Sequence, residues 1–241
     1  MFVLDSSGSI GSGNFQTIRN FVNAFVGTLE IGPTRSQVGV IVFSDDAYVQ
    51  FNLNTYSDRV TLMSAVNSVP YIGGGTNTAD ALQLLASQGF VGARPVSEGV
   101  PRVAIVVTDG MSNEPQDTVR AAEALRQGTS ITTYAVGIGG ADMTELNTIA
   151  STRNGVKLVR FIGSFDATEV ERLQEDLNEQ ACTGMDCNFT CIYIYFRAVT
   201  RSPCAYAHIC IFIYNACMSA GTVILTCIHN LQPFGCFIAT I

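Results

Sequence analysis

The sequence predicts a doubly wound α/β fold: a mostly parallel sheet with one antiparallel edge strand and helices on both faces. Two short apolar runs, residues 2–4 and 103–107, each stop at or near an aspartate, as buried parallel strands do. Between them, apolar side chains recur at helical spacing over residues 15–29 and leave one polar face. Strands that alternate with helices imply parallel pairing, because each helix carries the chain back across the sheet.

The next elements keep this alternation. Residues 38–43 form an unbroken apolar run, which is typical of a strand covered on both faces. Residues 48–53 follow the polar Asp45-Asp46 step, which predicts a hairpin leading to an edge strand. Further helices are predicted over residues 58–68, 77–88 and 116–127, with a strand over 131–138.

Two pairs of acidic residues have the spacing of a helix-capping box. Asp142 precedes Glu145 by three residues and predicts the start of a short helix. Asp166 and Glu169 repeat the pattern and predict a last helix that runs to about residue 180. These helices would complete the covering of the sheet.

Charge and cysteine content divide the chain into a domain, residues 1–181, and a cysteine-rich apolar tail, residues 182–241. The 241-residue protein has 20 acidic and 13 basic side chains and a net charge of −7. Every acidic residue lies before residue 187, whereas all eight cysteines lie from Cys182 to Cys236. The first piece is long enough to bury a core of its own.

Several function classes are excluded by composition. The domain is acidic and has a single lysine, Lys157, so it offers no basic face for nucleic acid. Both histidines, His208 and His229, lie in the tail, which removes serine- or cysteine-histidine catalysis and zinc-protease chemistry from the domain. The glycines of residues 137–140 lack the spacing of a dinucleotide-binding loop. We therefore expect no enzyme.

Three polar clusters fall where ligands bind in such a sheet, beyond the carboxyl ends of its strands. They are residues 5–9, directly after the first strand, 73–78, leading into a helix, and 108–110, after the central strand. Each combines small oxygen-bearing side chains with glycine. Hydroxyl and carboxylate oxygens suit Mg²⁺, Mn²⁺ or Ca²⁺ and suit zinc or copper poorly.

These clusters resemble a known family. DSSGS at residues 5–9, GGGTNT at 73–78 and TDG at 108–110 are similar to the three parts of the metal-ion-dependent adhesion site of von Willebrand factor type A domains. The resemblance covers residues 2 to about 181, and the surrounding sequence is similar to the matrilin and collagen branch. Three matching parts in the right order make it specific.

The resemblance implies a role for five residues. Ser7 and Ser9 would bind the metal through their hydroxyls, Thr76 would add a third hydroxyl, and Asp5 and Asp109 would act through bridging waters. The expected ion is Mg²⁺, with Mn²⁺ or Ca²⁺ as alternatives. The implied function is an extracellular adhesion or matrix module that captures an acidic residue of a matrix or cell-surface protein, collagen-type ligands included.

Ordinary structural roles remain as alternatives. Ser7, Ser9 and Thr76 could each cap a following helix, and Asp109 could be a turn residue. The Asp45-Asp46 step is interpreted as a solvated turn rather than a second metal site, and Glu114 and Asp117 as surface charges. At the level of function, the alternatives are an intracellular scaffold domain and metal-independent binding through another face.

The two ends of the chain carry separate expectations. The first strand has only four residues before Asp5 and no secretory signal precedes it, so we expect a fragment with a truncated first strand. The tail has three interpretations: a mistranslated or intron-derived segment, a membrane anchor over residues 205–228, or a disulfide module. Asn188-Phe189-Thr190 is a glycosylation sequon that has meaning only in a secreted protein.

Overall fold

The computed structural model describes residues 1–138, 140–162, 224–225 and 239–240. Its main feature is a six-stranded sheet in the order β3-β2-β1-β4-β5-β8. All neighbouring strands are parallel except β3, which pairs antiparallel with β2 at one edge. The strands are β1 (Phe2–Asp5), β2 (Val40–Phe43), β3 (Ala47–Phe51), β4 (Arg102–Thr108), β5 (Ile131–Ile138) and β8 (Val159–Ile162). The predicted fold class is confirmed.

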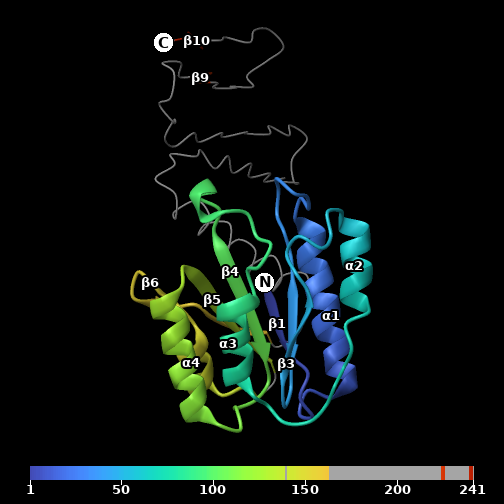
Figure 1. Ribbon diagram of the computed structural model, residues 1–241, viewed down its shortest axis with the longest axis vertical. Helices are drawn as coiled ribbons and strands as arrows, with labels where there is room; N and C mark the ends of the chain where they lie inside the picture. Colours follow the sequence, from blue (N-terminus) through green and yellow to red (C-terminus); the bar gives the residue numbers. More distant parts are fainter. Residues whose placement is uncertain (139, 163–223, 226–238, 241) are drawn as a thin grey trace, which may run out of the picture. The chain divides into compact units, whose positions relative to one another are not determined.

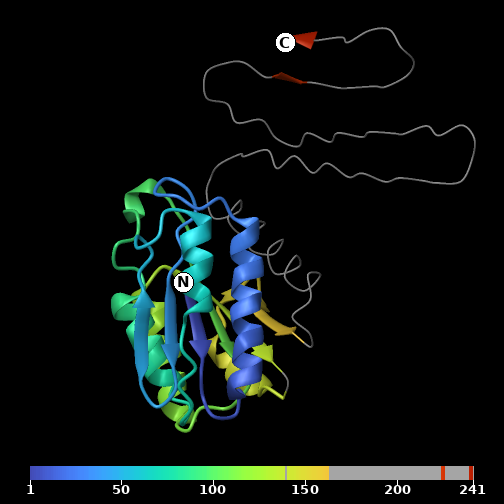
Figure 2. The same cartoon turned by 90° about the vertical axis from the view of Figure 1, so that its right-hand side faces the viewer.

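Helices cover both faces of this sheet (Figures 1 and 2). α1 packs against α2, whereas α4 packs against both α3 and α5. The helices are α1 (Gly11–Thr28), α2 (Arg59–Asn67), α3 (Thr78–Gln88), α4 (Pro115–Gly128) and α5 (Met143–Ile149). Smaller elements are the 3₁₀ turn η1 (Val96–Glu98) and the hairpin of β6 (Thr152–Arg153) and β7 (Val156–Lys157).

The apolar patterns of the sequence account for the core. All four residues of β1 are buried, because the strand lies between β2 and β4 with helices above and below. The Phe2 ring meets Phe25 of α1 edge-on at a centroid distance of 5.5 Å. The buried face of α1 consists mainly of apolar residues at helical spacing, Phe15, Ile18, Phe21, Val22, Phe25 and Val26.

Some element boundaries differ from the predicted ones. β2 begins at Val40 rather than residue 38, and β8 was not predicted, because Arg160 interrupts an apolar run of only four residues. Asp142 does cap α5, since its Oδ1 accepts a hydrogen bond from the Glu145 amide at 2.9 Å. The Glu145 carboxylate does not complete a capping box; it points to two other segments, described below.

The chain divides into two compact units, Met1–Leu177 and Asn178–Ile241. In the second unit, β9 (Ile224–Leu225) and β10 (Ala239–Thr240) form an antiparallel pair. The predicted helix ending near residue 180, the boundary at 181/182, the cysteines and most of the 205–228 span lie outside the described residues. Within the described part of the chain, no helix has the length and apolarity needed to cross a bilayer.

The connections that follow the neighbouring strands β1 and β4 diverge. These neighbours are parallel, so both end at the same edge of the sheet. β1 continues into α1, and the chain after β4 continues into α4, which packs in the other group of helices. Ligands of doubly wound folds bind where neighbouring connections diverge in this way. The Asp5 and Asp109 clusters stand at that point.

Candidate metal centre

Asp5 is the buried anchor of the site. It ends β1 and is fully buried. Its Oδ1 accepts a hydrogen bond from the Ser7 amide at 2.8 Å, and its Oδ2 accepts one from the Thr108 hydroxyl at 2.6 Å. Burial raises the pKa of Asp5 above its ordinary value of 3.8, and the nearby charge of Asp109 adds to this, while the Ser7 and Thr108 hydrogen bonds oppose it. A cation beside Asp5 would relieve this cost.

Ser7, Ser9 and Asp109 form a continuous array of oxygens. The Ser7 and Ser9 hydroxyl oxygens are 3.1 Å apart. The Ser9 hydroxyl donates to Oδ1 of Asp109 at 2.9 Å. Ser7 is buried, whereas Ser9 is exposed, so the array runs from the interior to the surface. Two of the three predicted clusters are thus brought into contact across about 100 residues of sequence.

The loop before Thr76 is bound to the Asp5 loop through its backbone. The Gly8 amide donates to the Gly74 carbonyl, and the Gly73 amide donates to the Ser6 carbonyl, both at 2.8 Å. Gly73 and Gly74 have φ values of 78° and 97°, in the region that favours glycine. The glycines therefore let the third cluster turn tightly against the first.

Asp45 holds the same loop from its other side. Its Oδ1 accepts a hydrogen bond from the Gly75 amide at 2.8 Å, and its carbonyl accepts one from the Asn77 side chain at 3.1 Å. Cβ atoms added at Gly74 and Gly75 would lie 2.3 Å and 2.6 Å from the Asp45 carboxylate oxygens. Asp45 is an exposed turn residue between β2 and β3, and in addition it supports the Thr76 loop. Nothing in the local sequence signals this contact.

Thr76 itself is buried, and its carbonyl is tied to the segment after Asp109. That carbonyl accepts hydrogen bonds from the Asn113 amide at 2.9 Å and the Ser112 hydroxyl at 3.1 Å. Among the described residues, the Thr76 hydroxyl makes no hydrogen bond, which leaves its oxygen available to a ligand. All three predicted clusters are therefore joined, the third by its backbone.

The capping alternatives fail. α3 is capped by Asn77, whose side-chain oxygen accepts from the Asp80 amide, so Thr76 is not the cap. α1 begins after Ile10 without a side-chain cap, so neither Ser7 nor Ser9 caps it. The hydroxyls of Ser7, Ser9 and Thr76 therefore do not serve as helix caps.

The spacing of the array fits an octahedral oxygen-bound cation. Adjacent ligands of Mg²⁺, bound at about 2.1 Å, lie about 3 Å from one another. The Ser7–Ser9 oxygen separation of 3.1 Å matches this value, and Asp109 lies behind this pair as the acceptor of the Ser9 hydroxyl at 2.9 Å. Within the described residues, no group of three or more His, Cys, Asp or Glu side chains is placed to hold a metal ion.

Fold and site together define a domain of the von Willebrand factor type A class. The family model described as von Willebrand factor type A domain matches residues 1–179, and the chain belongs to this family.

The curated relatives of this chain include matrilins and collagens. The collagen alpha-1(XII) chain of Notophthalmus viridescens is 34% identical over 185 residues, which cover 77% of this chain and 19% of that one. Matrilin-3 of Homo sapiens is 36% identical over 154 residues, which cover 63% of this chain and 31% of that one. The chain thus spans less than a third of the length of these matrix proteins.

Solved structures agree with this placement. Proximal thread matrix protein 1 from the mussel byssus, in its second crystal form, is 30% identical with a TM-score of 0.61. The match covers 75% of this chain and 44% of the mussel chain. The structure of that protein with a zinc-occupied MIDAS motif is 31% identical with a TM-score of 0.62, over 75% and 44% of the two chains. A neighbour with the same fold thus holds a divalent metal.

Gly74→Ala tests the loop that carries Thr76. We expect the variant to fold but to bind Mn²⁺ more weakly, by roughly tenfold or more. The added methyl group would displace the Asp45 carboxylate, and alanine is strained at the positive φ of this position. Calorimetry on the full chain measures the affinity. Gly13→Ala is the control, since a Cβ there meets nothing within 4 Å. Equal affinity in both variants would contradict the assigned role of the loop.

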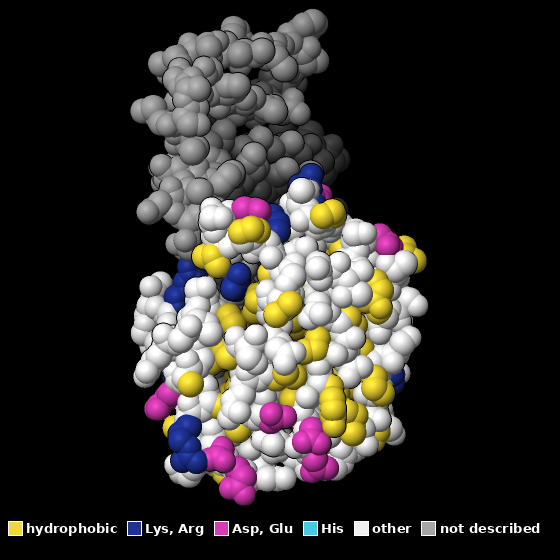
Figure 3. Space-filling model, viewed as in Figure 1, with side chains coloured by type: hydrophobic (Ala, Val, Ile, Leu, Met, Phe, Trp, Pro, Cys, Tyr) yellow, Lys and Arg dark blue, Asp and Glu magenta, His cyan; other side chains and the backbone are white. Residues whose placement is uncertain are grey.

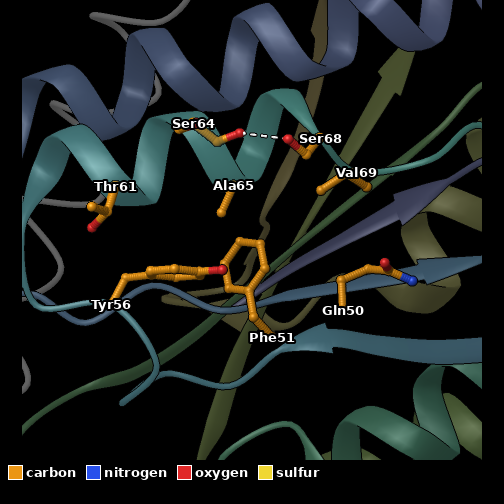
Figure 4. Close-up of a pocket in the computed structure, with 8 residues that line it drawn as sticks. All are labelled: Gln50, Phe51, Tyr56, Thr61, Ser64, Ala65, Ser68 and Val69. Carbon is orange, nitrogen blue, oxygen red and sulfur yellow. Dashed lines mark hydrogen bonds between the residues drawn. The ribbon is translucent and has the colours of Figure 1, made fainter.

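A separate cavity of about 440 Å³ lies between β3 and α2 (Figure 4). The Phe51 and Tyr56 rings meet edge-on at 5.1 Å on one side, and α2 lines the other with small side chains. The Ser68 hydroxyl donates to the Ser64 carbonyl, and the Thr61 hydroxyl donates to Asp58. All lining residues are uncharged, so this cavity has hydroxyls but no lining carboxylate to accompany them, unlike the Asp5 and Asp109 clusters.

Proposed function

We propose that this domain binds a protein ligand through a divalent cation held by Ser7, Ser9 and Thr76, with Asp5 and Asp109 behind them. The observation that carries the proposal is the oxygen array from Ser7 through Ser9 to Asp109 at the divergence of β1 and β4. The zinc-occupied site of the mussel neighbour supports the same class of chemistry.

The donor set predicts both the ion and the kind of ligand. Neutral hydroxyls donate little charge, and Mg²⁺ or Mn²⁺ keeps waters and accepts further oxygen ligands. Such a centre is electron-poor, so an anionic oxygen is its natural additional ligand. On a protein surface, aspartate or glutamate supplies that oxygen. Metal-mediated capture of a partner's carboxylate follows.

The surroundings make the metal necessary for this capture. Acidic side chains gather at the edge of the domain where the parallel strands finish (Figures 1 and 3). Among them, Asp45, Asp46 and Glu114 are exposed in the connections that follow β2 and β4. A negative edge concentrates cations but repels an acidic ligand. The ligand should therefore bind only when the cation neutralises this edge.

Apolar side chains beside the loops favour a protein ligand over a free anion. Ile72 directly precedes the glycines of the Thr76 loop and is 43% exposed. Met111 follows Asp109-Gly110 and is 57% exposed. Apolar residues around a charged centre are characteristic of protein interfaces, where they exclude water from the buried charge.

The proposed setting is the extracellular matrix, with matrix or cell-surface proteins as partners and collagen-type ligands among the candidates. The matrilin and collagen relatives support this setting and support a non-enzymatic role. We propose residues 1–181 as the functional module. An intracellular scaffold domain and a metal-independent contact through another face are the two competing functions.

Surface plasmon resonance of the full chain against a panel of matrix proteins tests the proposal. Binding should be abolished by EDTA and restored by Mg²⁺ or Mn²⁺. Thr76→Ala should weaken binding while the melting temperature changes little. Thr28→Ala is the matched control. Thr28 is exposed and is the last residue of α1, so it lies at the opposite end of that helix from the Asp5 loop. A partner that binds equally well in chelator would favour recognition through another face.

A further inference from the structure

Glu145 is a buried carboxylate that the proposed metal chemistry does not use. It lies in the first turn of α5 and is only 5% exposed. Its Oε1 accepts a hydrogen bond from the Thr78 hydroxyl at 2.9 Å, and its Oε2 accepts one from the Ser112 amide at 2.6 Å. Both donors are buried. A charged group this deeply buried is costly unless both of its oxygens are satisfied, as they are here.

The two donors belong to different segments of the metal centre. Thr78 is the first residue of α3, two positions after Thr76. Ser112 lies three positions after Asp109, and its hydroxyl donates to the Thr76 carbonyl. One carboxylate therefore joins the segment that carries the Thr76 hydroxyl to the segment that carries Asp109. It does so from α5, a helix that supplies none of the proposed metal ligands.

We propose that Glu145 is a positioning residue of the metal centre: by accepting hydrogen bonds from Thr78 and Ser112, it fixes the Thr76 and Asp109 segments at the separation that one cation requires. This inference rests on the proposed metal-dependent function. It adds α5 to the elements that determine metal affinity.

A carboxylate suits this task because it offers two acceptors at a fixed spacing. Glutamine can reproduce the geometry, since its carbonyl oxygen accepts from the Ser112 amide and its NH₂ donates to the Thr78 hydroxyl, which also accepts. Leucine fills the same space but leaves both donors unsatisfied. The two substitutions therefore separate the hydrogen-bonded geometry from the volume of the side chain.

Calorimetric titration of the full chain with Mn²⁺ tests the role. Glu145→Leu should weaken Mn²⁺ binding by roughly 10- to 100-fold, the cost typical of losing a group that orients metal ligands. Glu145→Gln should stay within about threefold of wild type, because only the charge assistance is lost. Leu146→Ala is the control for α5: Leu146 is fully buried, so the variant should melt at a lower temperature yet keep its Mn²⁺ affinity while folded.

Thr78 provides a second, milder pair of variants in case Glu145→Leu does not fold. Thr78→Val removes one donor and should weaken Mn²⁺ binding several-fold, whereas Thr78→Ser keeps the hydroxyl and should bind like wild type. Unchanged affinity in Thr78→Val, or an equal loss in Leu146→Ala, would overturn the positioning role.

Titration of Asp5→Ala separates the two proposals: if wild type binds Mn²⁺ and Asp5→Ala does not, the metal centre stands whatever the Glu145 variants do. Wild type that binds no Mn²⁺ overturns both.

Discussion

Asp5→Ala should abolish Mn²⁺ binding, with a loss in affinity of more than about 100-fold, the upper range for groups that orient metal ligands. Asp5 positions the Ser7 amide directly and supplies one of two carboxylates next to the hydroxyl array. Its removal leaves the Ser7 amide without its acceptor and withdraws a full negative charge from behind the cation. Calorimetry should show one site in wild type and no heat of binding in the variant.

The same substitution should leave the domain folded. The Ser7 amide and the Thr108 hydroxyl lose an acceptor, which costs about 1–3 kcal/mol. Against this, the raised pKa of Asp5 means that its ionised form is itself disfavoured by burial in the metal-free protein. Asp46→Ala is the control, because Asp46 is an exposed acid at the same edge. Undiminished Mn²⁺ binding in Asp5→Ala would remove the basis of the site.

Most of the fold could be predicted because its elements have strong local patterns. The run at residues 131–138 is a buried strand with the predicted limits, and α1 shows helical apolar spacing over several turns. The position of Asp5 and Asp109 at neighbouring strand ends followed from the alternation of strands and helices. Short elements such as β8 were not predicted, because four residues that include an arginine show no clear hydrophobic periodicity.

The contacts that shape the candidate site could not be predicted from the sequence. Asp45 binds Gly75 across 30 residues, and Glu145 binds Ser112 across 33 and Thr78 across 67. Local sequence assigned Asp45 to a turn and Glu145 to a capping box, both of which are ordinary short-range roles. Which partner a side chain meets depends on how the loops pack after the sheet has formed. The chemistry-bearing residues were recognisable, but their supports were not.

Gly137 shows how a sequence feature acquires its explanation only from packing. It lies in β5, where it pairs with Thr108 of β4 and Phe161 of β8. A Cβ atom added there would lie 2.5 Å from Cδ1 of Leu146 and 3.0 Å from Cβ of Ala141. The glycine is required because α5 packs directly on this strand.

Gly137→Val should therefore lower the free energy of unfolding by about 3 kcal/mol, the upper range for overpacking a core. The valine side chain would press on the buried Leu146 and on Ala141, and we expect this to displace α5 and Glu145 with it. If Glu145 positions the metal loops, Mn²⁺ affinity should fall together with stability, whereas Leu146→Ala should lower stability alone. Gly27→Val is the control, because a Cβ at Gly27 meets nothing within 4 Å and denaturant unfolding should change by less than about 0.5 kcal/mol. A Gly137→Val protein with wild-type stability would show that α5 does not depend on close contact with β5.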